Sequence, residues 1–150
     1  MSSNDDVIKF LKKEISKEEK ELEEKLIEEI EKSNDVKIVN RYSLRTNWLI
    51  DNSEDCLNEF RYLIFVNRII ISRVCFSNRY NGCMSRCFEI VKKYAKQIGI
   101  DIIEIQCVET YEMMRWCKKH KFVPKEFNIP ITDSEGRSVY IGDYYYKVGD

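Results

Sequence analysis

Apolar residues recur at helical spacing in the first part of the chain and at strand spacing after it. Between residues 8 and 30 they form one stripe of Ile8, Leu11, Ile15, Leu22, Leu26 and Ile30. The stripe predicts one amphipathic helix over residues 4–32, with Ser3 and Asp6 as a capping pair. Charged residues interrupt any heptad repeat, which favours a helix laid on the body of the protein. A coiled-coil arm of a homodimer stays open as the alternative.

Short apolar runs separated by polar turns follow this helix. They predict strands at 36–42, 48–50, 59–66 and 68–76, with Asn67 at the turn of the last pair. The connections between these runs are too short for crossovers, so we expect this half of the sheet to be antiparallel.

The centre of the chain has the order strand, glycine turn, helix, strand. An apolar run at 69–76 leads into a polar turn at 77–82, and a helical pattern at 84–98 is closed by Gly99. A second apolar run covers 100–108. A helical crossover of this kind predicts that the two flanking strands are parallel.

The last part of the chain predicts a short helix over 111–120 and a closing hairpin with strands at 122–131 and 139–148. A length of 150 residues suits one α/β domain that spans residues 1–150. In this domain, residues 36–148 would form the core against which the first helix lies.

Charge is unevenly distributed along the chain. Residues 1–35 contain 12 acids and 7 lysines, a net charge of −5, so the remaining 115 residues carry +4 of the total of −1. A balance this close to neutral gives no reason to expect nucleic acid or membrane partners. No apolar run approaches the ~20 residues that cross a bilayer. The mildly basic body suits an anionic ligand.

Six cysteines raise the question of disulfides and metal sites: Cys56, Cys75, Cys83, Cys87, Cys107 and Cys117. The first residues have no basic and apolar regions of a secretory signal, so we expect reduced thiols in a cytoplasmic protein. Cys83, Cys87, Cys117 and His120 leave a zinc site open, but their spacing is unusual for zinc and we expect no metal. A nucleophile pair of Cys117 with His120 is disfavoured, because a spacing of three residues on one helix rarely orients the histidine as a base toward the cysteine sulfur.

The turn before the central helix presents backbone N–H groups to an anion. The N–H groups of a first helical turn have no intrahelical partner, and the helix dipole favours negative charge there. Gly82 permits close approach of a ligand, and Arg79 adds a charge-assisted contact. The turn has too few glycines for the dinucleotide fingerprint and no lysine for a Walker A loop. A diphosphate fits such a turn.

The order of elements resembles the GNAT superfamily of acyl-CoA N-acyltransferases. The family's cofactor motif, Arg/Gln-x-x-Gly-x-Gly/Ala, is similar to Arg79-Tyr80-Asn81-Gly82-Cys83-Met84. The helix end Ala95-Lys96-Gln97-Ile98-Gly99 looks like the family's Ala-x-x-x-Gly, and residues 142–148 look like its last strand. The resemblance covers 36–148. It implies an α/β (α+β) fold: a mixed, mostly antiparallel sheet flanked by helices, with a V-shaped splay between two central strands. The long N-terminal helix predicted above stands in place of the family's usual first strand and helices.

The resemblance also implies acetyl-CoA as co-substrate and a small-molecule or peptide amine as acceptor. The pantetheine would lie along Val74, Cys75 and Phe76, whose backbone polarises the thioester. The diphosphate and its surroundings would involve Arg79, Tyr80, Asn81, Gly82, Cys83, Met84, Ser85 and Thr110.

The same resemblance implies direct attack by the amine, so that a base must take its proton. Glu104 and Glu109 are the candidate bases, with Glu59 on the preceding strand; each is interpreted first as a solvated strand residue. Cys117 stands where the family's proton-donating tyrosine stands.

Four positions depart from the family pattern: Met84, Thr110, Cys117 and Lys121. They leave a second hypothesis open, a GNAT-like scaffold that has lost catalysis and binds a partner through its N-terminal helix. In such a scaffold the splay would be plugged, with Met84, Trp116 or Tyr111 as the plug. The acceptor would be selected by residues 42–55 and the turn at 132–137.

Overall fold

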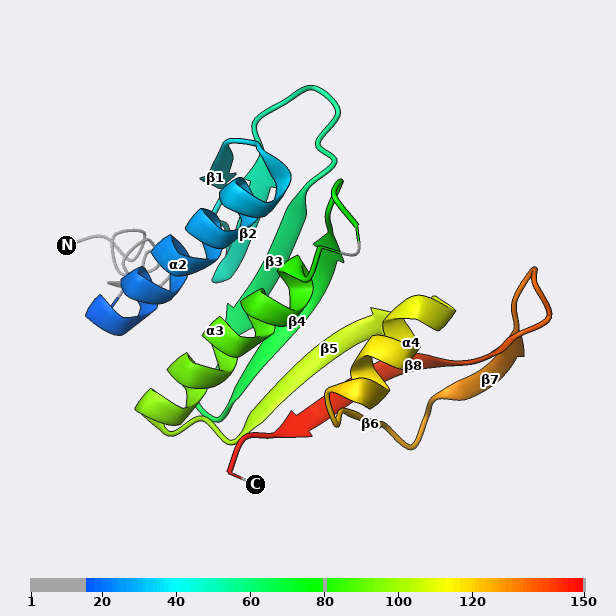
Figure 1. Ribbon diagram of the computed structural model, residues 1–150. Helices are drawn as coiled ribbons and strands as arrows, with labels where there is room; N and C mark the ends of the chain where they lie inside the picture. Colours follow the sequence, from blue (N-terminus) through cyan, green and yellow to red (C-terminus); the bar gives the residue numbers. More distant parts are fainter. Residues whose placement is uncertain (1–15, 80, 150) are drawn as a thin grey trace, which may run out of the picture.

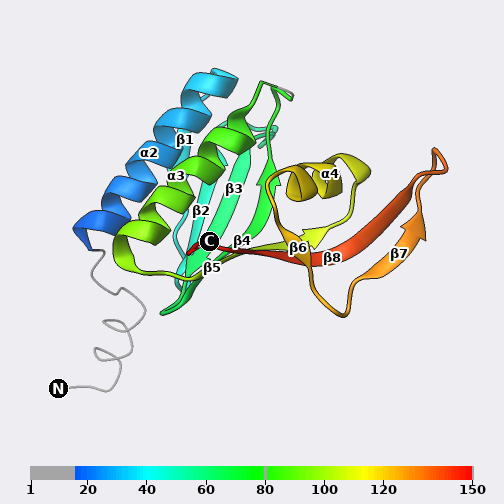
Figure 2. The ribbon, with the colours of Figure 1, turned by 60° about the horizontal axis from the view of Figure 1, so that its bottom comes forward.

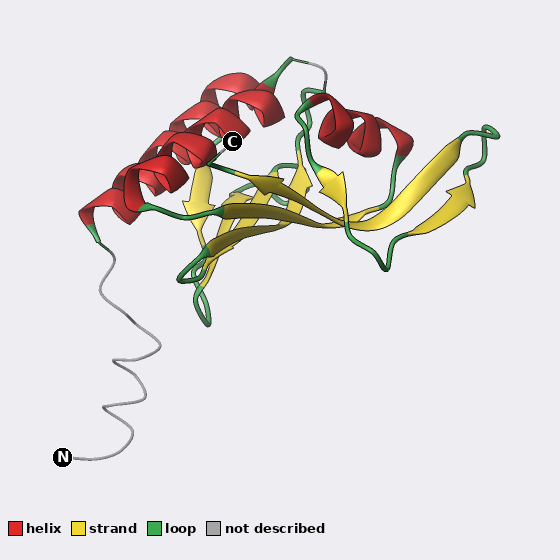
Figure 3. Ribbon diagram, turned by 90° about the horizontal axis from the view of Figure 1, so that it is seen from below, coloured by secondary structure: helices red, strands yellow, loops and turns green. Residues whose placement is uncertain are grey.

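A computed structural model describes residues 16–79 and 81–149, and its elements follow the predicted order. They are α2 (Lys17–Asn34), β1 (Ile38–Asn40), β2 (Thr46–Asp51), β3 (Glu59–Ile64), β4 (Arg68–Cys75), α3 (Cys83–Ile98), β5 (Ile102–Val108), α4 (Tyr111–Lys119), β6 (Val123–Pro124), β7 (Ile129–Thr132) and β8 (Ser138–Lys147). The described helices all lie on one face of one twisted sheet (Figures 1 and 3).

The sheet has the strand order β1-β2-β3-β4-β5-β8-β6, and β7 pairs with the outer part of β8. β4 and β5 are parallel, with α3 as the crossover between them. The other pairings among the described strands are antiparallel. The predicted mixed, mostly antiparallel sheet is confirmed.

Helix α2 begins later and ends later than the apolar pattern predicts. Ser16 is its N-cap, and the Ser16 hydroxyl accepts a hydrogen bond from the N–H of Glu19 at 3.1 Å. Serine followed three residues later by glutamate is the start signal that the predicted helix over 4–32 overlooked. The helix continues to Asn34, where Asp35 closes it with a left-handed backbone. Residues 4–15 of the predicted helix, and the Ser3–Asp6 pair, lie outside the described residues.

α2 lies beside α3 (Figure 1), and its apolar stripe packs into the core. Leu22, Leu26 and Ile30 are 2%, 0% and 0% exposed and join one cluster with α3 and the sheet. Burial of each such side chain stabilises the fold by roughly 1.5–3 kcal/mol. A coiled coil would need this stripe free for a partner helix, so the coiled-coil alternative is wrong for the described part of α2.

The closing hairpin is interrupted, so the single predicted strand over 122–131 is wrong. β6 and β7 both pair with β8, but the chain leaves the sheet between them. The Asn128 side chain bonds to the backbone of Asp143. Oδ1 of Asn128 accepts the Asp143 N–H at 3.1 Å, and Nδ2 of Asn128 donates to the Asp143 carbonyl at 3.0 Å. Gly142 makes room, because a Cβ there would overlap the Asn128 side chain. Beyond this point the β7–β8 hairpin projects from the body (Figure 2).

Candidate acyl-CoA site

β4 and β5 separate toward their carboxyl ends. They pair only from Arg68 to Ile71 of β4. β4 then stays with β3 as far as Cys75, and β5 stays with β8 as far as Val108. The two strands open into a V whose inner edges carry backbone groups without a strand partner (Figure 1). The predicted splay between two central strands is confirmed.

A bulge in β5 begins where this strand stops pairing with β4. The register with β8 shifts between Ile105 and Val108, and Cys107 has a left-handed backbone with φ 56°. The N–H of Cys107 donates to Oδ1 of Asp143 at 2.9 Å. A left-handed conformation costs a residue with a side chain roughly 1–2 kcal/mol, which this hydrogen bond helps to offset. The bulge therefore belongs to the geometry that keeps the splay open.

The turn before α3 is bonded to the end of α2. Asn81 Nδ2 and Asn78 Nδ2 donate to the carbonyl of Ser33 at 2.8 and 2.9 Å. The N–H of Asn78 donates to the buried side chain of Asn34 at 3.0 Å. Oδ1 of Asn81 accepts the N–H of Cys83 at 3.0 Å. The predicted ligand contacts of Asn81 and of the Cys83 backbone are thus already made within the protein.

The N-terminus of α3 still presents free backbone donors. Gly82 is the N-cap with φ 81° and has no side chain to cap the helix. The N–H groups of Met84 and Ser85 have no acceptor within the helix, and its first turn contains no acidic residue. Arg79 is exposed in the same turn, whereas Tyr80 lies outside the described residues.

Arg86 also reaches this helix N-terminus and was missed by sequence reasoning. Its Nη1 lies 2.8 Å from the point where a Cβ would stand on Gly82. Its Nε donates to Glu29 and its Nη2 to the Ser33 hydroxyl, each at 3.0 Å. A cation at the positive end of a helix dipole is unfavourable, and the Glu29 carboxylate compensates for it. The available signal was an arginine one helical turn after the capping glycine.

Ser85 joins α3 to α4. Its oxygen accepts the indole N–H of Trp116 at 3.0 Å and lies 3.2 Å from Nε2 of His120. Burial, followed by the charge of Lys119, lowers the pKa of His120. The Ser85 hydroxyl can donate its proton to Nε2 of a neutral imidazole while its oxygen accepts the indole N–H. The His120 side chain therefore reaches from the C-terminal end of α4 to the first turn of α3.

The three predicted plugs lie in different places. Trp116 contacts the N-terminal turn of α3 through Ser85. Met84 packs against the core, and the Tyr111 ring lies 4.3 Å from the guanidinium of Arg137. Of the three, only Trp116 bridges the helices on either side of the splay.

The α4 positions singled out by the sequence have structural roles. Cys117 is fully buried, and this burial raises the pKa of its thiol to about 12. Thr110 caps α4, with its hydroxyl accepting the N–H of Met113 at 3.2 Å. Glu109 is exposed at the end of β5, directly before Thr110.

Glu104 and Glu59 are buried, so their interpretation as solvated strand residues is wrong. Glu104 is 3% exposed and forms ion pairs with Arg68, at 3.4 Å, and with Lys125. Glu59 is 8% exposed and pairs with Arg73 at 2.6 Å. A buried carboxylate needs such partners, because desolvation penalises an unpaired charge. Glu109 is therefore the freer of the two candidate bases.

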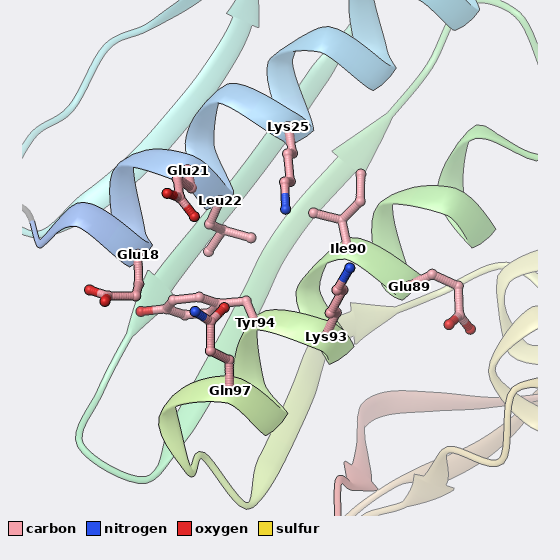
Figure 4. A pocket seen from close by; sticks show the side chains of 9 residues that line it. All are labelled: Glu18, Glu21, Leu22, Lys25, Glu89, Ile90, Lys93, Tyr94 and Gln97. Carbon is pink, nitrogen blue, oxygen red and sulfur yellow. The ribbon is translucent and has the colours of Figure 1, made fainter.

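Two surface pockets lie against α2, away from the splay. One, of about 330 Å³, is a groove between α2 and α3 with Leu22, Ile90 and Tyr94 among its lining residues (Figure 4). Acidic and basic side chains of both helices surround it (Figure 4). Neither pocket contains a residue that the sequence singled out for cofactor binding.

Two kinds of feature are absent from residues 16–79 and 81–149. No group of three or more His, Cys, Asp or Glu side chains there is placed to hold a metal ion. None of the helices there combines the length and the apolar composition that a bilayer crossing requires.

The sequence matches no family model and no curated protein. A probable acetyltransferase (GNAT family) from Chromobacterium violaceum shares the fold with a TM-score of 0.50 and 16% identity, over 70% of this chain and 58% of that one. Nourseothricin acetyltransferase shares it with a TM-score of 0.50 and 9% identity, over 69% of this chain and 66% of that one. A GNAT family acetyltransferase from Elizabethkingia anophelis was solved with acetyl-CoA bound. It matches with a TM-score of 0.49 and 9% identity, over 69% of this chain and 76% of that one. This chain therefore has a GNAT-like fold.

Proposed function

We propose that this chain is an N-acetyltransferase that binds acetyl-CoA in the splay and transfers the acetyl group to an amine. The observation that carries the proposal is the splay beside an open helix N-terminus: unpaired strand edges lie next to the free N–H groups of Met84 and Ser85. The GNAT-like fold supports it, because two solved structures that share this fold with a TM-score of 0.50 are named as acetyltransferases.

Each part of acetyl-CoA meets matching chemistry. The pantetheine arm carries amide groups, which pair with the unpaired edge of β4 around Val74, Cys75 and Phe76. The diphosphate lies at the N-terminus of α3, where backbone N–H groups and Arg86 offset its charge. The same β4 backbone polarises the thioester carbonyl as negative charge develops on its oxygen.

The chemical step is direct attack. The amine nitrogen bonds to the thioester carbon, the carbon–sulfur bond breaks, and CoA leaves as a thiolate. Glu109, exposed at the end of β5, takes the amine proton directly or through water. Proton transfer from Cys117 to a thiolate of ordinary pKa, about 8.5, is uphill by about 3.5 pKa units or about 5 kcal/mol. Cys117 is therefore a poor proton donor, and CoA leaves as the thiolate.

Calorimetric titration of acetyl-CoA tests the proposal. We expect a dissociation constant between about 1 µM and 1 mM for the natural sequence, the usual range for enzyme substrates. Gly82→Trp should abolish binding because the indole would cover the N-terminus of α3. Gly99→Trp is the matched control: Gly99 has the same φ of 81° at the other end of α3, with nothing within 4 Å of its Cβ position.

Equal binding of acetyl-CoA by both variants would show that the diphosphate does not bind at the N-terminus of α3. No binding by the natural sequence would refute the acetyltransferase proposal. If acetyl-CoA binds as expected, amines can be screened by release of the CoA thiol.

A further inference from the structure

The described helices all lie on one face of the sheet (Figure 3). Charged and aromatic side chains form a row on the opposite face. Phe60 and Tyr62 of β3 point into the core and are 0% and 1% exposed. Because side chains alternate along a strand, Arg61 between them points to the other face. The cross-strand partners of Arg61 are Trp48 on β2 and Arg73 on β4. This row, Trp48–Arg61–Arg73, runs across three neighbouring strands.

The row is already ordered. The guanidinium of Arg61 lies 4.4 Å from the centre of the Trp48 ring, a cation–π contact. Glu59 holds the two arginines from the side, with Oε1 at 2.6 Å from Nε of Arg73 and 3.5 Å from Nη2 of Arg61. Two guanidinium groups against one carboxylate leave the row with a net positive charge.

Two hydrogen-bond donors in this row have no acceptor. Nε1 of Trp48 and Nε of Arg61 are both buried and make no hydrogen bond to any described residue. Buried donors in proteins are almost always bonded, and one left unmade costs roughly 1–3 kcal/mol. The two unused donors belong to side chains that contact each other, so they lie in the same part of the row. A carboxylate has acceptor capacity for both, and its charge complements the guanidinium groups.

The row leads to the splay. Arg73 lies in the part of β4 that has already separated from β5. With a strand spacing of about 4.8 Å, Arg61 on β3 is roughly two spacings, about 10 Å, from the middle of the V. A molecule whose anionic group lies on the row can therefore reach the splay with a group several bonds away.

We propose that the Trp48–Arg61–Arg73 row binds the carboxylate of the acceptor, so that the substrate is a small amine that also carries a carboxylate several bonds from its nitrogen. The role of the amine rests on the proposed acetyl transfer, but carboxylate binding to the row does not. Arg61 supplies the charged donor fork, Trp48 supplies the indole N–H and orients Arg61 by stacking, and Arg73 lies closest to the splay.

The two tryptophans of the chain provide the test. Each indole N–H gives one cross-peak in a ¹H–¹⁵N spectrum, and Trp48→Phe assigns them. The probe is 5-aminopentanoate, titrated without acetyl-CoA into the millimolar range; pentylamine, which lacks only the carboxylate, is the matched control. We expect the Trp48 cross-peak to shift and saturate with 5-aminopentanoate alone. The Trp116 cross-peak should stay in place, because its N–H is already bonded to Ser85.

Arg61→Gln should weaken the 5-aminopentanoate titration about tenfold or more, the usual effect of losing a charged hydrogen-bond partner. Arg73→Gln is the second variant. Its side chain is 63% exposed, so the substitution leaves the core intact, and we expect a weaker titration here too. An unmoved Trp48 cross-peak, or equal shifts with pentylamine, would overturn the proposal. Failure of acetyl-CoA to bind would instead refute the proposed acetyltransferase function, and the 5-aminopentanoate titration would still show whether the row binds a carboxylate.

Discussion

The Phe88 side chain of α3 packs against α4, and we expect its truncation to destabilise the fold strongly. Phe88 is 1% exposed and its ring contacts those of Trp116, His120, Phe122 and Tyr146, with centroids 5.1 to 5.6 Å away. Truncating a buried phenylalanine to alanine costs about 3–5 kcal/mol. Aromatic pairs contribute about 0.5–1.5 kcal/mol each beyond their buried area, so we expect Phe88→Ala near the upper end, about 5 kcal/mol.

Phe88→Leu is the matched control, because leucine keeps most of the apolar volume and loses only the ring contacts. We expect it to cost about 1–2 kcal/mol. Urea denaturation followed by tryptophan fluorescence and circular dichroism measures both. With a slope of about 2 kcal/mol per molar urea, Phe88→Ala should lower the midpoint by about 2.5 M. A loss under about 1 kcal/mol for Phe88→Ala would refute the view that this cluster fixes α4.

Two further predictions concern pH and thiols. Hydrogen bonds, chiefly from Asn58, lower the pKa of Asp51. The ionised Asp51 carboxylate therefore stabilises the fold fully above its ordinary pKa of about 3.9, and this stabilisation is lost as the pH falls through the lower pKa of the folded state. Asp51→Asn should therefore be less stable than the natural sequence at pH 7, with a difference in unfolding free energy that shrinks in acid; a pH-independent difference would contradict this. Of the six cysteines, Cys56, Cys75 and Cys107 are exposed and the others buried, so a thiol reagent should modify three rapidly and six only after denaturation. Rapid reaction of Cys117 would show that α4 does not shield it.

Periodicity predicted the elements well where one residue pattern decides them. The stripe of α2 and the apolar run of β4 each depend on burial of one face, which spacing alone reveals. The splay was predicted only through the family resemblance. The bulge that bends β5 depends on Cys107 and Asp143, residues on different strands that no local pattern connects.

The candidate site was harder to predict because its contacts join distant parts of the chain. Arg86 reaches the N-cap of its own helix but is held by Glu29, more than fifty residues earlier. Glu104 looked solvated because it alternates with apolar neighbours; its burial depends on Arg68 and on Lys125 from the connection after β6. Long-range charge pairing leaves no periodic signature in a sequence.

The hydrogen bonds between α2 and the turn before α3 have a consequence for binding. A loop that orders only when its ligand arrives loses conformational entropy at that moment, which weakens affinity. Here Asn78 and Asn81 are already held by Ser33 and Asn34, so that entropy is lost when the protein folds. α2 thereby preorganises the N-terminus of α3 for an anion that α2 itself need not touch.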